Sequence, residues 1–145
     1  MLITALAEMT RARLRVLREQ SPVRTAADAF ADQRVGLIIV ADEGEAARGV
    51  ISKSDLVRHL AGNGRVDAPL VEVMTRHVVF AAPSDDLHAT WQLMVRRQLQ
   101  NLPLIDAGRR PVGVLDVRDA LEAILMQEER QEDQLINYIA GTGYR

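Results

Sequence analysis

The stretch Gly49-Val50-Ile51-Ser52-Lys53-Ser54-Asp55 recurs 64 positions later as Gly113-Val114-Leu115-Asp116-Val117-Arg118-Asp119. The same register places Asp42 on Asp106, and the triplet Met-Thr-Arg opens both copies, at residues 9–11 and 74–76. A period of this length is too long for a solenoid repeat, so it indicates two half-domains that share one core. We expect these half-domains at residues 1–64 and 65–127, followed by a helical tail at 128–145.

Composition limits the classes of protein to which the chain can belong. Its 145 residues, 48% of them hydrophobic, can bury enough apolar surface for a packed domain. The absence of cysteine excludes disulfides, a thiol nucleophile and thiolate metal ligands. A net charge of −2 with scattered basic residues argues against a nucleic-acid-binding surface.

Catalytic and metal-binding patterns are missing from the sequence. It contains no Gly-rich phosphate loop, no nucleophile elbow and no His–carboxylate constellation, so we expect a binding module and not an enzyme. Its histidines, His59, His77 and His88, lack the spacing of metal ligands. The opening residues have no basic leader and are interrupted by Glu8, and no stretch approaches the roughly 20 apolar residues that span a bilayer. We therefore expect a cytoplasmic protein.

Hydrophobic periodicity predicts the same order of elements in both halves, and hence an α/β fold. In the first half we expect a helix at 26–33, strands at 37–41 and 49–51, and a helix at 53–61. In the second half we expect a short lead-in helix at 70–75, a helix at 86–98, strands at 102–105 and 112–115, and a helix from 117. Leu135, Ile136 and Ile139 predict that this last helix continues toward Gly141.

These residues, taken together, resemble the cystathionine-β-synthase (CBS) domain, and the tandem pair resembles a Bateman module. The resemblance rests on Gly49 to Asp55, on Val73-Met74-Thr75-Arg76, on Leu102-Pro103-Leu104-Ile105-Asp106, and on a tail at 134–141 similar to that of small stand-alone bacterial CBS-pair proteins. It implies two small sheets, each flanked by helices, that pack about a pseudo-twofold axis with two clefts between them. In many members these clefts hold AMP, ADP, ATP, NAD or S-adenosylmethionine and so regulate a partner, which here would be another, unidentified protein.

Ser52 and Asp55 have two interpretations. Their spacing at a strand-to-helix junction is that of a capping box, in which each side chain bonds a backbone N–H of the helix start. The same geometry can instead hold a nucleotide, since exposed N–H groups attract phosphate and a carboxylate accepts hydrogen bonds from a ribose diol. Spacing alone favours capping, and the resemblance favours the ligand. It also assigns ligand-binding positions to Val16, Gly36, Leu37, Ile38 and Lys53.

The second copy departs from the pattern at one position. Asp119 matches the ribose-binding acid, but Asp116 replaces the expected Ser or Thr and would repel a phosphate. Arg118 could partly offset that repulsion. We therefore expect the two clefts to differ, with about one strong nucleotide site per chain.

Two expectations concern surfaces. The resemblance and the apolar residues of the final helix predict a homodimer to which the C-terminal segment contributes. The basic stretch Arg11, Arg13, Arg15 and Arg18 has no interleaved aromatic residues, so we expect it to form an exposed edge.

Overall fold

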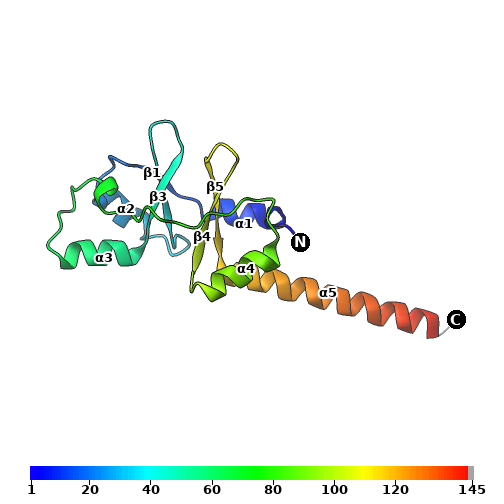
Figure 1. Cartoon of the computed structure of the whole chain (residues 1–145). Helices are drawn as coiled ribbons and strands as arrows, with labels where there is room; N and C mark the ends of the chain where they lie inside the picture. The colour runs from blue at the N-terminus through cyan, green and yellow to red at the C-terminus, as the bar shows by residue number, and fades with distance from the viewer. Residues whose placement is uncertain (144–145) are drawn as a thin grey trace.

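The computed structural model of the chain describes residues 1–143. It confirms an α/β fold made of two repeats (Figure 1). In chain order the elements are the 3-10 turn η1 (Ile3–Leu6), α1 (Ala7–Ala12), β1 (Val16–Arg18), α2 (Val23–Ala29), β2 (Ile38–Ala41), β3 (Ala47–Ile51), α3 (Lys53–Ala61), the 3-10 turn η2 (Leu70–Glu72), α4 (Leu87–Arg96), β4 (Asn101–Ile105), β5 (Pro111–Asp116) and α5 (Val117–Gly143).

Each repeat builds its own small sheet. In the first sheet β1 is parallel to β2, and β2 is antiparallel to β3, with Ile38 opposite Ile51. The second sheet is the antiparallel pair β4–β5, and a single parallel bridge between Ala81 and Leu104 takes the place of a third strand. The two hairpins lie side by side (Figure 1), and the backbone N–H of Ala47 donates to the carbonyl of Arg109 between them. A shared apolar cluster of Leu37, Ile39, Ala47, Val50 and Val114 joins the halves.

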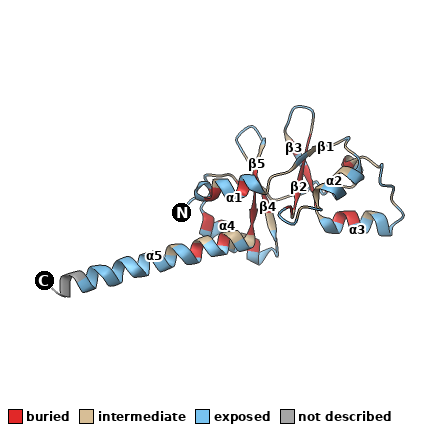
Figure 2. Ribbon diagram, turned by 180° about the vertical axis from the view of Figure 1, so that it is seen from behind, coloured by how far each residue is buried: buried red, intermediate tan, exposed pale blue. Residues whose placement is uncertain are grey.

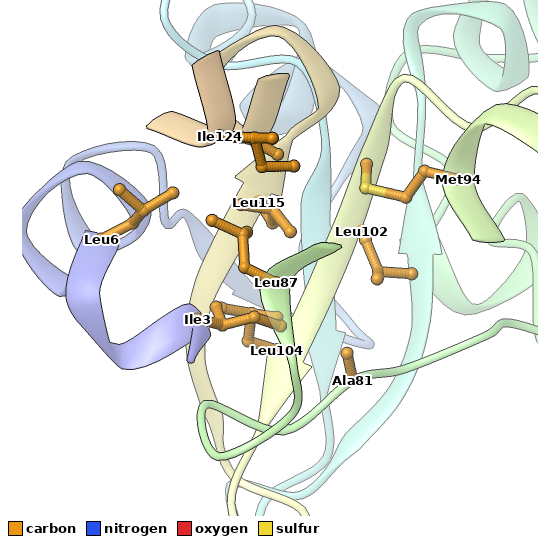
Figure 3. Packing of buried hydrophobic residues seen from close by; sticks show 10 residues of the cluster. Ile3, Leu6, Ala81, Leu87, Met94, Leu102, Leu104, Leu115 and Ile124 are labelled. Atoms are coloured by element: carbon orange, nitrogen blue, oxygen red, sulfur yellow. The ribbon is translucent and has the colours of Figure 1, made fainter. Parts of the chain in front are cut away.

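The two halves exchange their lead-in segments. Ile3 and Leu6, at the start of the first half, pack into the core of the second half with Leu87, Leu104 and Leu115 (Figure 3). Leu70 and Met74, at the start of the second half, pack into the core of the first half. The exchange interlocks the repeats, so neither half completes its core from its own residues.

Gly49 and Gly113 allow this exchange. A Cβ atom at Gly49 would lie 2.6 Å from the backbone oxygen of Thr75, and one at Gly113 would lie 2.9 Å from the side chain of Thr10. Each repeated Met-Thr-Arg triplet therefore crosses the strand glycine of the opposite half. This close approach explains why both glycines fall in register in the sequence.

Some expected boundaries were wrong. Helix α2 begins at Val23 and ends at Ala29, earlier than the predicted 26–33, because Pro22 supplies an extended N-cap. The lead-in helix at 70–75 is only the turn η2, since Thr75 leaves it to pair with Val50. Helix α3 has its predicted bounds, but Val57 and Leu60 of its apolar face are exposed.

Helix α5 confirms the predicted extension and continues to Gly143. Its first turns pack on the second half, where Ala120 and Ile124 are buried. Beyond them it projects away from the body as a nearly fully exposed rod (Figures 1 and 2).

Candidate functional site

The first candidate site is the start of α3, where Ser52 is the N-cap. Its hydroxyl accepts from the backbone N–H of Asp55 at 3.1 Å, and the Asp55 carboxylate accepts from the backbone N–H of Ser52 at 2.9 Å. This is a complete capping box. The capping interpretation of the two residues is therefore confirmed, and it leaves open whether they also bind a ligand.

Two further side chains hold the Asp55 carboxylate. The hydroxyl of Thr75 lies 3.3 and 3.4 Å from its two oxygens, and Arg58 donates to it from the same helix at 3.2 Å. Asp55 is almost fully buried, whereas the side chain of Arg58 is 75% exposed. Thr75 was not predicted as a site residue, although its place in the repeated triplet was a usable signal.

The structure brings most of the predicted first-site residues to one end of the first sheet. Ile38 pairs with Ile51, directly before Ser52, but its side chain is fully buried, so only its backbone could reach a ligand. The Lys53 ammonium lies 5.9 Å from the ring centroid of Phe30. Val16 lies farther off, because β2 separates it from Val50.

Gly36 precedes β2 and touches the other repeat. A Cβ atom there would lie 2.6 Å from the side-chain nitrogen of Asn101, so a larger residue would require the Asn101 amide to move. The Asn101 side-chain oxygen is buried without a hydrogen-bond partner among the described residues. Leu37, next to Gly36, is buried in the cluster that joins the halves.

The second candidate site is the start of α5. The Asp116 carboxylate accepts from the backbone N–H groups of Arg118 at 2.7 Å and of Asp119 at 3.3 Å. It also accepts from the Arg118 guanidinium at 3.1 Å. Asp116 therefore caps this helix as Ser52 caps α3, and Arg118 offsets its charge as the sequence suggested.

The partner of Asp119 was not predicted. The Arg13 guanidinium donates through Nε to Oδ2 at 2.6 Å and through Nη2 to Oδ1 at 3.3 Å, a bidentate pair. Arg13 is only 20% exposed, so the expectation that it lies on an exposed edge was wrong. Arg15, which pairs with Asp32, also departs from that expectation. No local pattern links residues 106 positions apart.

Mutual contacts shift the ionisation of this cluster. The hydrogen bond to Asp119 is the main cause that raises the pKa of Arg13. Burial opposes ionisation of Asp116, but the hydrogen bonds from Arg118 and the charge of Arg13 outweigh it, and the pKa of Asp116 is lowered from its usual value. The same contacts raise the pKa of Arg118, chiefly through its hydrogen bond to Asp116, so the charged forms of Arg13, Asp116 and Arg118 are all favoured.

Surface hollows also occur away from the two helix starts. One is lined at the hairpin end by Arg18, Asp42 and Gly44, and one of similar volume by Phe80, Pro83 and Ile105. A smaller one lies between the repeats and is lined by Val16, Arg110 and Pro111. Within residues 1–143 we find no cluster of His, Asp and Glu that could hold a metal ion. Over the same residues, no helix is long and apolar enough to cross a bilayer.

Two interlocked α/β repeats, each with a capped acidic helix start beside the other repeat, define a tandem-repeat module. The profile of the CBS domain matches residues 4–62 and again 70–126. The chain belongs to the CBS domain family, and it is a pair of CBS domains, or Bateman module.

Similar proteins span different contexts. The chain is 22% identical over 140 residues to an uncharacterized 17.7 kDa protein of Acidianus ambivalens, covering 97% of this chain and 85% of that protein. It is 29% identical over 122 residues to the gamma-3 subunit of the bovine (Bos taurus) 5'-AMP-activated protein kinase, covering 78% of this chain but only 24% of the subunit.

Solved structures share the fold. The CBS domain protein PAE2072 from Pyrobaculum aerophilum, complexed with AMP, has a TM-score of 0.69 at 23% identity, covering 78% of this chain and 87% of that one. The CBS domain pair of protein MJ0100, in complex with 5'-methylthioadenosine and S-adenosyl-L-methionine, has a TM-score of 0.72 at 19% identity, covering 88% and 98%.

Proposed function

We propose that this protein is a regulatory module that binds an adenosine-containing ligand at the start of α3 and transmits its occupancy to a partner protein. The ligand is AMP, ADP, ATP, NAD or S-adenosylmethionine. Support comes from the pairing of Ser52 and Asp55 at a helix start within a CBS pair, together with the adenosine compounds in the complexes of PAE2072 and MJ0100.

The strongest support for a ligand at this position is the burial of the Asp55 carboxylate and the nature of its partners. The carboxylate is buried and fixed by the Ser52 backbone and by Thr75, while its guanidinium partner, Arg58, is a largely exposed side chain on the same helix. A ribose diol could take the place of Arg58, because its two hydroxyls can donate hydrogen bonds to the buried carboxylate as the guanidinium does. Lys53 would supply a cation to the phosphate in this arrangement.

A structural dimerisation module with empty clefts is the alternative function. The complete capping box favours it, because the box accounts for both Ser52 and Asp55 without any ligand. Ligand binding itself must therefore decide between the two functions.

Thermal unfolding with AMP, ATP, NAD and S-adenosylmethionine tests the proposal. A ligand at 100 times its dissociation constant should stabilise the protein by about 2.7 kcal/mol. Asp55→Asn should weaken binding about ten- to hundredfold in calorimetry, because a hydrogen bond to a charged group is worth about 1.5–3 kcal/mol. Asp67→Asn, at an exposed acid paired with Arg65, is the matched control and should bind normally. A folded protein that gives no shift across the panel would leave only the structural alternative.

We also propose that the module is a homodimer. Exposed apolar side chains occupy equivalent positions in the two halves, Val57 on α3 and Leu121 on α5, and continue along α5 with Leu125. Farther along, Leu135, Ile136 and Ile139 are exposed as well. A second copy would remove this apolar surface from water.

Truncation after Gln127 should weaken the dimer, because it removes the exposed apolar residues at the far end of α5. Light scattering at tens of micromolar measures the effect, and a shorter truncation that keeps Ile139 is the control. A monomeric parent protein would contradict the homodimer. A dimer untouched by the longer truncation would contradict the contribution of the tail.

A further inference from the structure

Arg13 joins three parts of the molecule. It lies between α1 and β1, its Nε and Nη2 bind both oxygens of Asp119 at the start of α5, and its Nη1 donates to the backbone oxygen of Arg34 at 3.0 Å. Nη1 also lies 3.8 Å from Asp116. One guanidinium thus connects the exchanged N-terminal segment, the second helix start and the loop before β2.

Within residues 1–143, no arginine of an exchanged segment reaches the first helix start, where Asp55 is paired with Arg58 of its own helix. Asp55 is the counterpart of Asp119, and the two Met-Thr-Arg triplets align Arg13 with Val78, an apolar residue of the cluster between the halves. The lead-in segment that reaches Asp55 contributes the neutral hydroxyl of Thr75. The repeats therefore differ at the position that faces the acid, in addition to the replacement of Ser by Asp116.

We propose that Arg13 is a built-in occupant that keeps the second cleft closed, so that a ligand can bind there only after displacing it. The proposal rests on the function proposed above for its assignment of ribose binding to the acid of each helix start. Arg13 holds both oxygens of Asp119, the atoms that a ribose diol would need. The side chains of Arg13 and Asp119 are also only 20% and 17% exposed.

The charges around the cleft define the ligand that would take Arg13's place. Removing the Arg13 cation leaves the carboxylates of Asp116 and Asp119 with Arg118 as the nearby counter-charge. A phosphate would meet Asp116 there and be repelled. The opened cleft therefore selects neutral adenosine over AMP, the opposite of the preference we expect at Ser52.

Displacement also has a mechanical consequence. The bond from Arg13 to the Arg34 carbonyl is lost together with the bonds to Asp119. Occupancy of the second cleft would thus break the link that Arg13 makes between the loop before β2 and the start of α5.

Calorimetry with adenosine tests the proposal in proteins whose first cleft is weakened by Asp55→Asn. The single variant Asp55→Asn should bind adenosine at least tenfold more weakly than the double variant Asp55→Asn with Arg13→Ala does. The double variant should bind one adenosine per chain. Adding Asp119→Asn should remove that binding, and AMP should bind the opened cleft more weakly than adenosine does. Arg11→Ala, at an exposed arginine in the same segment, is the control and should gain nothing.

Arg13→Gln provides a second variant in case the alanine variant does not fold, since it keeps the length of the side chain and removes the charged fork. If the opened variants bind adenosine through Asp119 while the parent protein binds no adenosine compound at all, the first-cleft function fails and the role of Arg13 stands. If the parent binds but neither Arg13 variant gains a site, the role of Arg13 is overturned. If no protein in the series binds, both proposals fall.

Discussion

Ile3→Ala should lower the free energy of unfolding by about 2–5 kcal/mol, the usual cost of emptying a fully buried aliphatic position. Ile3 is 1% exposed and packs among Leu87, Leu104 and Leu115 of the second half (Figure 3). Denaturant unfolding followed by circular dichroism measures the change.

The adjacent residue supplies the control for this experiment. Leu2 is 51% exposed, so Leu2→Ala should change the unfolding free energy by no more than about 0.5 kcal/mol. Equal effects of the two substitutions would show that the N-terminal segment does not belong to the core of the second half.

Gly49→Ala should destabilise the protein by about 3 kcal/mol. The new methyl group would lie 2.6 Å from the backbone oxygen of Thr75, which cannot rotate away as a side chain does. To relieve this clash, β3 and the segment at Thr75 must move apart. This movement weakens the two backbone hydrogen bonds between Val50 and Thr75. Overpacking costs about 1–3 kcal/mol, and each lost bond adds about 1 kcal/mol.

Gly108→Ala is the matched control for Gly49→Ala. Gly108 lies in the turn of the other hairpin, where a Cβ atom would make an ordinary 3.5 Å contact with Asp106. Thermal unfolding of both variants should leave Gly108→Ala close to the parent protein. Similar stability of the two variants would contradict the close crossing at Gly49.

Local patterns were sufficient to predict the elements that depend on local chemistry. Helix α3 begins and ends where its capping box and apolar spacing place it, because capping is decided by residues three apart. The internal register likewise predicted two similar half-domains, and the family match is consistent with that duplication. The ligand-binding roles of Ser52, Asp55 and the remaining predicted residues stay predictions.

Contacts between distant segments could not be predicted in the same way. The pairing of Arg13 with Asp119 and the crossing of Ile3 into the other half depend on how the repeats interlock, which periodicity does not encode. Spacing made Val57 part of an apolar face, but it could not show that no described part of the chain covers that face. The arginines at 11–18 looked alike in sequence, and only the fold distinguishes the half-buried Arg13 from the exposed Arg11.

Helix α5 starts at the second helix start and extends as one continuous element of 27 residues. At 1.5 Å per residue it is about 40 Å long, and its first turns, through Ile124, are packed on the second half. A tilt of about 5° of the whole helix would move its far end by about 3.5 Å, roughly the width of an atom contact. A small adjustment around Asp119 would thus be geometrically amplified at Leu135 and Ile136, two exposed residues on the projecting part of the helix.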